Sequence, residues 1–133
     1  CAMEIHVTRQ VMAAIEEAAR AAHSHECCGI LLGADGDITQ ALPARNVHTD
    51  PATRFEIDPQ ALIDAYRAER KGGAAVLGFY HSHPKGAPAP SAIDAQLASR
   101  DGRIWAIHGE GRTAFFKSTP AGFEALSYTA IDP

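Results

Sequence analysis

The sequence lacks clusters of positive charge and any long apolar run. Among its 133 residues, 12 are Lys or Arg and 16 are Asp or Glu, which gives a formal net charge of −4. Because nucleic-acid affinity usually rests on clustered Lys and Arg, this balance argues against a nucleic-acid partner. No apolar stretch approaches the length that a bilayer-spanning helix needs, so we expect no membrane contact.

Cysteine is scarce as well, with residues only at Cys1, Cys27 and Cys28. An odd count that includes two neighbours does not indicate a disulfide framework, so we expect Cys27 and Cys28 to be small core residues. No basic segment followed by an apolar stretch opens the chain, and a reducing cytoplasm is the expected compartment. Cys1 and Ala2 precede Met3, so we expect Met3 to be the native start and the two residues before it to be an addition.

What is present is the composition of an ordinary globular protein, 46% apolar and 21% charged. We expect a single domain over residues 3–133, which is long enough to bury one core. The order of elements mixes hairpins with crossovers, so we predict an α/β fold with a mixed, largely antiparallel sheet. Strands are predicted over 3–8, 26–33, 38–46, 54–57, 74–81, 103–108, 113–118 and 123–131, and helices over 9–22, 59–71 and 91–99.

Two of these helices have clear start signals. Thr8 is the predicted N-cap of the helix over 9–22, and Asp58 followed by Pro59 starts the helix over 59–71. Apolar residues at helical spacing in the second helix define its predicted inner face, which consists of Leu62, Ile63 and Tyr66.

The most informative stretch runs from residue 78 to 94. In a strand, residues two apart point to the same face, so His81 and His83 present two imidazoles side by side at the strand's end. Asp94 lies one helical turn after Ser91, and both residues can face the histidines. Two His and one carboxylate leave a fourth tetrahedral position open, which is the ligand pattern of catalytic zinc.

Such a site also needs a base and a group that stabilises the oxyanion. Glu26 stands at the head of a buried apolar strand, where a carboxylate is poorly solvated, and it is the candidate base. Ser91 is the candidate donor of a hydroxyl hydrogen to the oxyanion that forms when water attacks a carbonyl.

Each of these features has a plainer interpretation. Ser91 and Asp94 have the spacing of a capping box, which is compatible with the metal site. Glu26 by itself is also consistent with a surface acid at the start of a strand. Residues 23–25 form a second His-x-His, but it falls at the end of a helical pattern, where residues two apart do not share a face. We expect that segment to be a solvated helix end.

The zinc-site residues resemble a known motif, the JAMM motif of the MPN (JAB) zinc metalloprotease family. The resemblance is carried by the pattern Glu26…His81-Ser82-His83-Pro84…Ser91-x-x-Asp94. Residues 26–33, 54–59 and 78–84 also resemble stretches of the family's small bacterial members. The resemblance implies a fold similar to the cytidine-deaminase architecture, with helices flanking a central sheet.

Transferred position by position, the resemblance implies a role for each polar residue of the motif. His81, His83 and Asp94 would hold one zinc ion per chain. Glu26 would act first as general base and then as general acid, and Ser91 would stabilise the tetrahedral intermediate.

The resemblance also implies a reaction. Larger family members cleave isopeptide bonds of ubiquitin with the help of inserted segments, for which this chain has no room. It is similar to the compact prokaryotic forms, some of which process ubiquitin-like sulfur carriers that end in Gly-Gly. The implied function is a zinc-dependent metallopeptidase that hydrolyses a peptide or isopeptide bond in a protein or peptide substrate, such as the C-terminus of such a carrier.

Two alternatives stay open beside this function. One is a non-catalytic MPN-type scaffold that binds protein, against which the complete ligand set argues. The other is a RadC-like JAB protein associated with DNA, whose His-x-His-Pro run is similar. The strand that begins at Glu26 and the acidic balance favour the peptidase.

Overall fold

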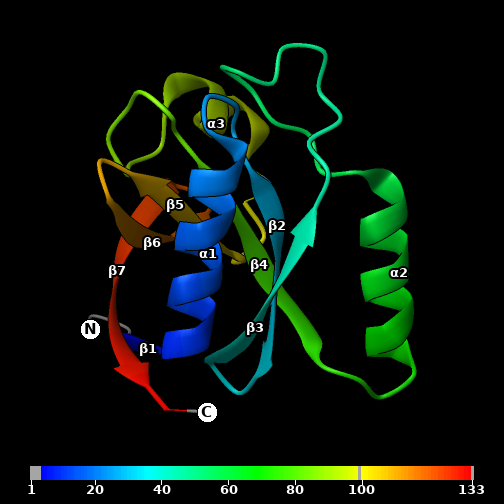
Figure 1. The fold of residues 1–133 in the computed structure, drawn as a ribbon. Coiled ribbons are helices and arrows are strands. Elements are labelled where there is room, and N and C mark those ends of the chain that lie inside the picture. Colours follow the sequence, from blue (N-terminus) through cyan, green and yellow to red (C-terminus); the bar gives the residue numbers. More distant parts are fainter. Residues whose placement is uncertain (1–3, 99, 133) are drawn as a thin grey trace.

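The computed structural model describes residues 4–98 and 100–132, so the expectations for Cys1, Ala2 and Met3 lie outside the described residues. Ser99, the last residue of a predicted helix, lies outside them too. Along the described chain the elements are β1 (Glu4–Thr8), α1 (Arg9–Ala22), β2 (Cys28–Ala34), β3 (Asp37–Ala44), α2 (Pro59–Arg70), β4 (Ala75–Ser82), α3 (Ala92–Leu97), β5 (Ile104–Gly109), β6 (Arg112–Thr119) and β7 (Gly122–Ile131) (Figure 1).

The strands form a mixed sheet that closes on itself. Their order is β1-β3-β2-β4-β5-β6-β7, and β7 pairs with β1. The pairs β2–β3, β2–β4, β5–β6 and β6–β7 are antiparallel, whereas β1–β3, β1–β7 and β4–β5 are parallel. The expectation of a mixed, largely antiparallel sheet is therefore confirmed.

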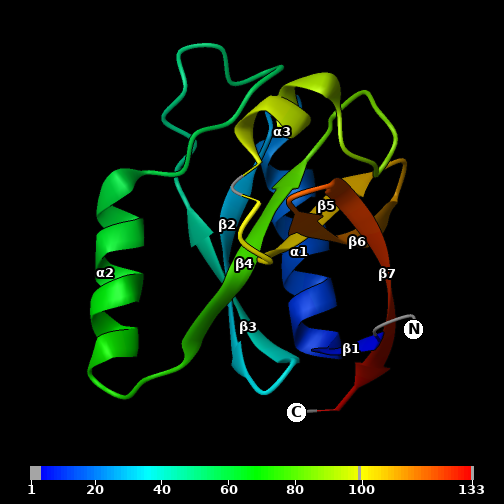
Figure 2. The ribbon, with the colours of Figure 1, turned by 180° about the vertical axis from the view of Figure 1, so that it is seen from behind.

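Helices α1 and α2 pack on opposite faces of the sheet, as the two views in Figures 1 and 2 show. On the α1 face, Val11 and Ile15 pack with buried residues of several strands, among them Leu31. On the α2 face, Ala65 packs with Ile30 of β2 and with residues of β4. Neighbouring positions of β2 thus point into two different cores, which explains why this strand is apolar throughout. Each buried aliphatic side chain contributes about 1.5–3 kcal/mol.

Both predicted helix starts are confirmed. The Thr8 hydroxyl accepts a hydrogen bond from the backbone N–H of Val11 at 3.2 Å. The Asp58 carboxylate accepts one from the N–H of Gln60 at 3.1 Å, and Pro59 is the first helical residue. These local bonds satisfy donors that a helix start leaves without an intrahelical partner.

The predicted inner face of α2 is wrong at one position. Ile63 is 48% exposed, whereas Ala65 is 5% exposed and faces the core. Leu62 and Tyr66 pack beside Ala65 as expected. Because successive helical residues are about 100° apart, Ile63 lies about 200° from Ala65, on the far side of the helix.

The strand predicted over 54–57 is also wrong, since only Ile57 makes a single bridge there, with Asn46. Two backbone groups of this segment bond to the Asn46 side chain, namely the carbonyl of Arg54 and the N–H of Glu56. Strand β3 ends at Ala44, two residues before the end predicted from the sequence. Among the described residues, no helix is long and apolar enough to cross a membrane.

Candidate metal centre

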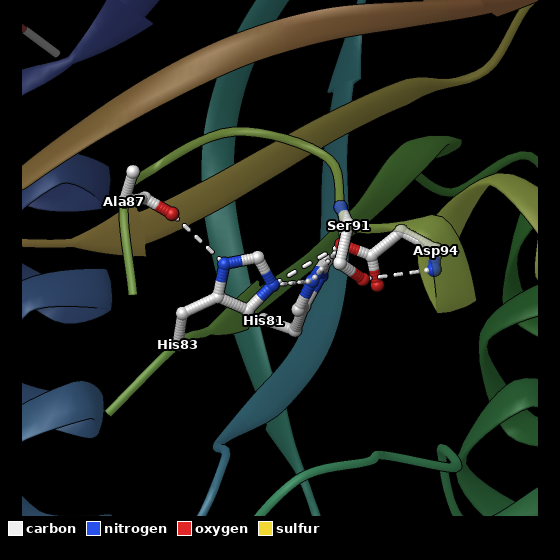
Figure 3. A network of polar contacts seen from close by, with 5 residues as sticks. All are labelled: His81, His83, Ala87, Ser91 and Asp94. Atoms are coloured by element: carbon white, nitrogen blue, oxygen red, sulfur yellow. Dashed lines mark hydrogen bonds and ion pairs between the residues drawn. The ribbon is translucent and has the colours of Figure 1, made fainter. Parts of the chain in front are cut away.

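The candidate ligands come together where β4 ends. His81 lies in β4, and the N–H of His83, just beyond the strand, donates to the carbonyl of His108 at 2.7 Å. This bond keeps the chain extended past Ser82, so that both imidazoles are presented on one side. The chain then turns back and enters α3, which carries Asp94 (Figure 3).

Three ligand atoms form a small triangle. His81 Nε2 lies 3.1 Å from His83 Nε2 and 3.2 Å from Asp94 Oδ2, and His83 Nε2 lies 3.1 Å from Asp94 Oδ2. A tetrahedron's edge is about 1.63 times its centre-to-corner distance, so this triangle corresponds to bonds of about 1.9–2.0 Å, close to zinc–nitrogen and zinc–oxygen bond lengths. The three side chains therefore fit one tetrahedral metal ion and leave its fourth position open.

The His83 ring is oriented by the loop that follows it. His83 Nδ1 lies 2.9 Å from the Ala87 carbonyl oxygen. A carbonyl can only accept, so Nδ1 carries the hydrogen and, in the neutral ring, the Nε2 lone pair points toward the triangle. Asp94 also raises the pKa of His83, mainly through its hydrogen bond to the ring.

Asp94 is held by a complete capping box. The Ser91 N–H donates to Asp94 Oδ2 at 2.9 Å, and the Asp94 N–H donates to Ser91 Oγ at 3.0 Å. Burial by itself would raise the pKa of Asp94, but the hydrogen bonds with His81 and His83 outweigh it and lower that pKa. The capping interpretation is thus confirmed, and the same box places Oδ2 against both imidazoles.

His81 is enclosed by aromatic side chains. The Phe55 ring stacks on it with centroids 4.3 Å apart and planes 16° apart, and Trp105 contacts it edge-on at 5.6 Å. His81 is 1% exposed, and burial lowers its pKa although Asp94 opposes the shift. The ring is therefore neutral at pH 7. The sequence indicates neither contact, because Phe55 and Trp105 lie far from His81 along the chain.

Glu26 reaches the same place from the segment just before β2. Register brings it there, because Cys28 pairs with His81 in the antiparallel β2–β4 ladder. Ligand atoms of Glu26, His81 and His83 all lie within 4.8 Å of one another. Glu26 is 6% exposed, so its interpretation as a surface acid is wrong. Burial raises its pKa to about 7, with His83 lowering it and Asp94 adding to the rise.

One cavity borders Glu26, His83 and Ser91. It has a volume of about 250 Å³ and is lined by Glu26, His83 and Ser91 together with Ala52, Thr53, Pro84, Lys85, Gly86 and Ile93. The Ser91 oxygen accepts a hydrogen bond from Asp94, which leaves its own hydrogen free to donate. A carbonyl group that entered this cavity would meet the candidate base and the hydroxyl together.

Other features named from the sequence do not join the site. His23 and His25 are exposed at the end of α1 and are not part of the metal-ligand group, in agreement with a solvated helix end. Cys27 and Cys28 are buried free thiols, as expected of core residues. Ser82 points away from the ligands and accepts a hydrogen bond from the N–H of Cys27 at 2.9 Å.

Two imidazoles and a carboxylate at tetrahedral spacing, with a second carboxylate near both imidazoles, are the parts of a metal-dependent hydrolase. A family model for prokaryotic homologs of the JAB domain matches residues 8–119. The chain belongs to this family, and the resemblance to JAB proteins noted in the sequence is confirmed.

Curated relatives share much of the chain. The desampylase of Haloferax volcanii is 38% identical over 106 residues, which are 77% of this chain and 76% of the relative. The probable TtuB-protein conjugate cleaving protease of Thermus thermophilus is 40% identical over 62 residues, 47% of this chain and 42% of the relative. The CysO-cysteine peptidase of Mycobacterium tuberculosis is 30% identical over 83 residues, 61% of this chain and 56% of the relative.

Solved structures show the same fold. A Desulfitobacterium hafniense protein, determined in solution, has a TM-score of 0.83 at 26% identity and covers 98% of this chain and 94% of its own. A structure reported as JAMM, a metalloprotease-like zinc site in the proteasome and signalosome, has a TM-score of 0.60 at 20% identity and covers 96% of this chain and 99% of its own. At that identity the second likeness concerns the fold alone.

Proposed function

We propose that this chain is a zinc-dependent metallopeptidase that hydrolyses a peptide or isopeptide bond. His81, His83 and Asp94 hold one zinc ion, Glu26 is the general base and then the general acid, and Ser91 stabilises the oxyanion. The observation that carries the proposal is the triangle of ligand atoms with sides of 3.1–3.2 Å. We also propose that residues 3–133 form one such domain, and the free thiols of Cys27 and Cys28 support a reducing, cytoplasmic compartment.

The choice of Asp94 over Glu26 as third ligand rests on distance. Asp94 Oδ2 lies within 3.2 Å of both imidazole nitrogens and is bonded to both, whereas the ligand atoms of Glu26, His81 and His83 lie only within 4.8 Å of one another. Two ligands of one tetrahedral zinc ion are about 3.3 Å apart, so the closer carboxylate fits the ion. Glu26 is then available as the base.

Zinc bound by these ligands would act as a Lewis acid that activates water at neutral pH. The Glu26 carboxylate takes the proton of the attacking water and later gives a proton to the leaving amine. The Ser91 hydroxyl donates to the oxygen of the scissile carbonyl as negative charge develops on it. Burial of Glu26 and Asp94 keeps the charged groups in a medium where these interactions are strong.

We propose that the substrate is the C-terminus of a ubiquitin-like sulfur carrier that ends in Gly-Gly. Three relatives support a protein conjugate as substrate, since they are named as a desampylase, a TtuB-protein conjugate cleaving protease and a CysO-cysteine peptidase. A glycine tail also suits the cavity, because residues without side chains can bring a carbonyl close to Glu26 and Ser91.

The decisive experiment is the replacement Glu26→Gln. We expect the variant to bind zinc at one ion per chain by elemental analysis and to lose about 10²–10⁴-fold in turnover. The matched control is Glu124→Gln, which removes an exposed carboxylate from β7 and leaves turnover unchanged. A fully active Glu26→Gln enzyme would refute the assigned base.

Mass spectrometry of carrier proteins, with and without a C-terminal extension or an isopeptide-linked lysine, identifies the bond that is cleaved. We expect release of a carrier that ends at Gly-Gly. A wild-type protein that binds zinc but leaves every such conjugate intact would favour the scaffold function instead.

A further inference from the structure

We propose that Asn46 is a positioning residue that holds both the base and the aromatic cover of His81 in place. It lies between β3 and α2, outside every motif that the sequence indicates. The inference rests on the proposed function, because Glu26 and His81 owe their importance to it. The hydrogen bonds on which it is based, however, can be tested by measurements that do not depend on enzyme activity.

The Asn46 side chain uses its full hydrogen-bonding capacity. Nδ2 donates to the carbonyl of Glu26 at 2.9 Å and to the carbonyl of Arg54 at 3.0 Å. Oδ1 accepts from the N–H of His48 and from the N–H of Glu56, both at 3.1 Å. Two donors and two acceptor positions are all that an amide offers. Because two partners are carbonyls and two are N–H groups, these bonds also fix which way the amide points.

The first consequence concerns Glu26. This residue precedes β2, so its backbone is not part of the sheet's ladder there. Its carbonyl is bonded to Asn46, and its N–H donates to the carbonyl of Pro51 at 2.7 Å. Both backbone groups of the base are therefore held by the single segment 46–56. Asn46 is the first residue of that segment, and its side chain bonds to Arg54 and Glu56 at the other end.

The second consequence concerns Phe55. Arg54 and Glu56 flank Phe55 in the chain, and the Asn46 side chain bonds to both of them. These two bonds set the position of the Phe55 backbone. The Phe55 ring stacks on His81 and contacts Trp105 at 6.1 Å between centroids. The Asn46 amide thus connects the proposed base, Glu26, with Phe55, the ring that stacks on His81.

The test is Asn46→Asp, which keeps the shape and both acceptors but removes both donors. A carboxylate oxygen would then face the carbonyl oxygens of Glu26 and Arg54. The matched control is Gln40→Glu, the same amide-to-acid change at an exposed position of β3. Loss of a group that orients a ligand or its neighbour commonly costs 10–100-fold in activity, and we expect a drop of about that size in kcat with zinc retained.

A second readout does not depend on catalysis. Trp105 is the single tryptophan of the chain, and it contacts both Phe55 and His81. We expect Asn46→Asp to shift its fluorescence emission in zinc-free protein, well below the unfolding temperature, whereas Gln40→Glu does not. A merely structural role would lower the unfolding temperature and leave kcat and emission of the folded protein unchanged.

The wild-type protein supplies a measurement that needs no variant. We expect the Nδ2 hydrogens of Asn46 to show slow exchange with solvent by NMR, as doubly bonded amide hydrogens do. The inference is overturned if those hydrogens exchange as fast as those of Gln40, or if Asn46→Asp matches the control in kcat and emission. If wild-type protein cleaves no conjugate, the proposed function fails, while exchange and emission still decide the role of Asn46.

Discussion

Replacing Gly109 by Ala tests whether the loop after His83 controls the metal site. A Cβ at this position would lie 2.3 Å from the Gly86 carbonyl oxygen, 2.9 Å from the Ala87 carbonyl carbon and 3.0 Å from the Pro88 nitrogen. All three are backbone atoms, so no side-chain rotation can relieve the contact. Gly109 has no positive φ, and the backbone itself therefore accepts alanine. The requirement for glycine comes from the approach of the loop.

The cost follows from the size of the clash. Normal contacts between such atoms are about 3.5 Å, so the loop must retreat by about 1 Å. The bond between His83 Nδ1 and the Ala87 oxygen is 2.9 Å long, and a displacement of that size breaks it. Losing the partner that orients a ligand lowers metal affinity by about 10–100-fold, which corresponds to about 1.4–2.8 kcal/mol.

The assay is competition for zinc against a chromophoric chelator, combined with NMR of the imidazole nitrogens in zinc-free protein. We expect weaker zinc binding and loss of the Nδ1–H form of His83 in Gly109→Ala. Gly86→Ala is the matched control, because its Cβ would lie 3.4 Å from the His83 Cβ, an ordinary contact in the same loop. Equal zinc affinities and equal ring spectra for the two variants would refute the reasoning.

Three further replacements test other parts of the structure. Gly29→Ala places a Cβ 2.2 Å from the buried Tyr80 ring, and we expect urea unfolding to show a loss of about 1–3 kcal/mol or more; an unchanged midpoint would contradict it. Ser91→Ala removes the Oγ cap of Asp94 but keeps the backbone bond, so zinc should stay bound while turnover falls about 10²–10³-fold, and an unaltered kcat would remove Ser91 from the mechanism. Thr8→Ala should cost about 0.5–2 kcal/mol of thermal stability and leave kinetics unaltered, so a change in kcat would speak against a purely local cap.

The sequence predicted the features that depend on residues close together in the chain. The caps at Thr8, Asp58 and Ser91 were predicted because a cap needs only a side chain and backbone groups within three residues. The shared face of His81 and His83 was predicted because strand geometry repeats every two residues. Such features depend on spacing along the chain, which the sequence states directly.

Tertiary structure decided which separate segments meet. The sequence made Glu26 the candidate base, but its approach to within 4.8 Å of the histidines depends on the pairing of β2 with β4. Neither spacing nor periodicity indicated three contacts of the site. These are the stacking of Phe55 on His81, the hydrogen bonds of Asn46, and the approach of the loop to Gly109.

The physical reason is that these contacts satisfy groups whose partners lie far along the chain. Residues 54–57 have the pattern of a strand, yet the carbonyl of Arg54 and the N–H of Glu56 bond to the side-chain amide of Asn46, and no local propensity records that choice. The sequence by itself determined the helices, most strands and the candidate ligands. Only the folded chain determined which residues hold those candidate ligands and the candidate base in position.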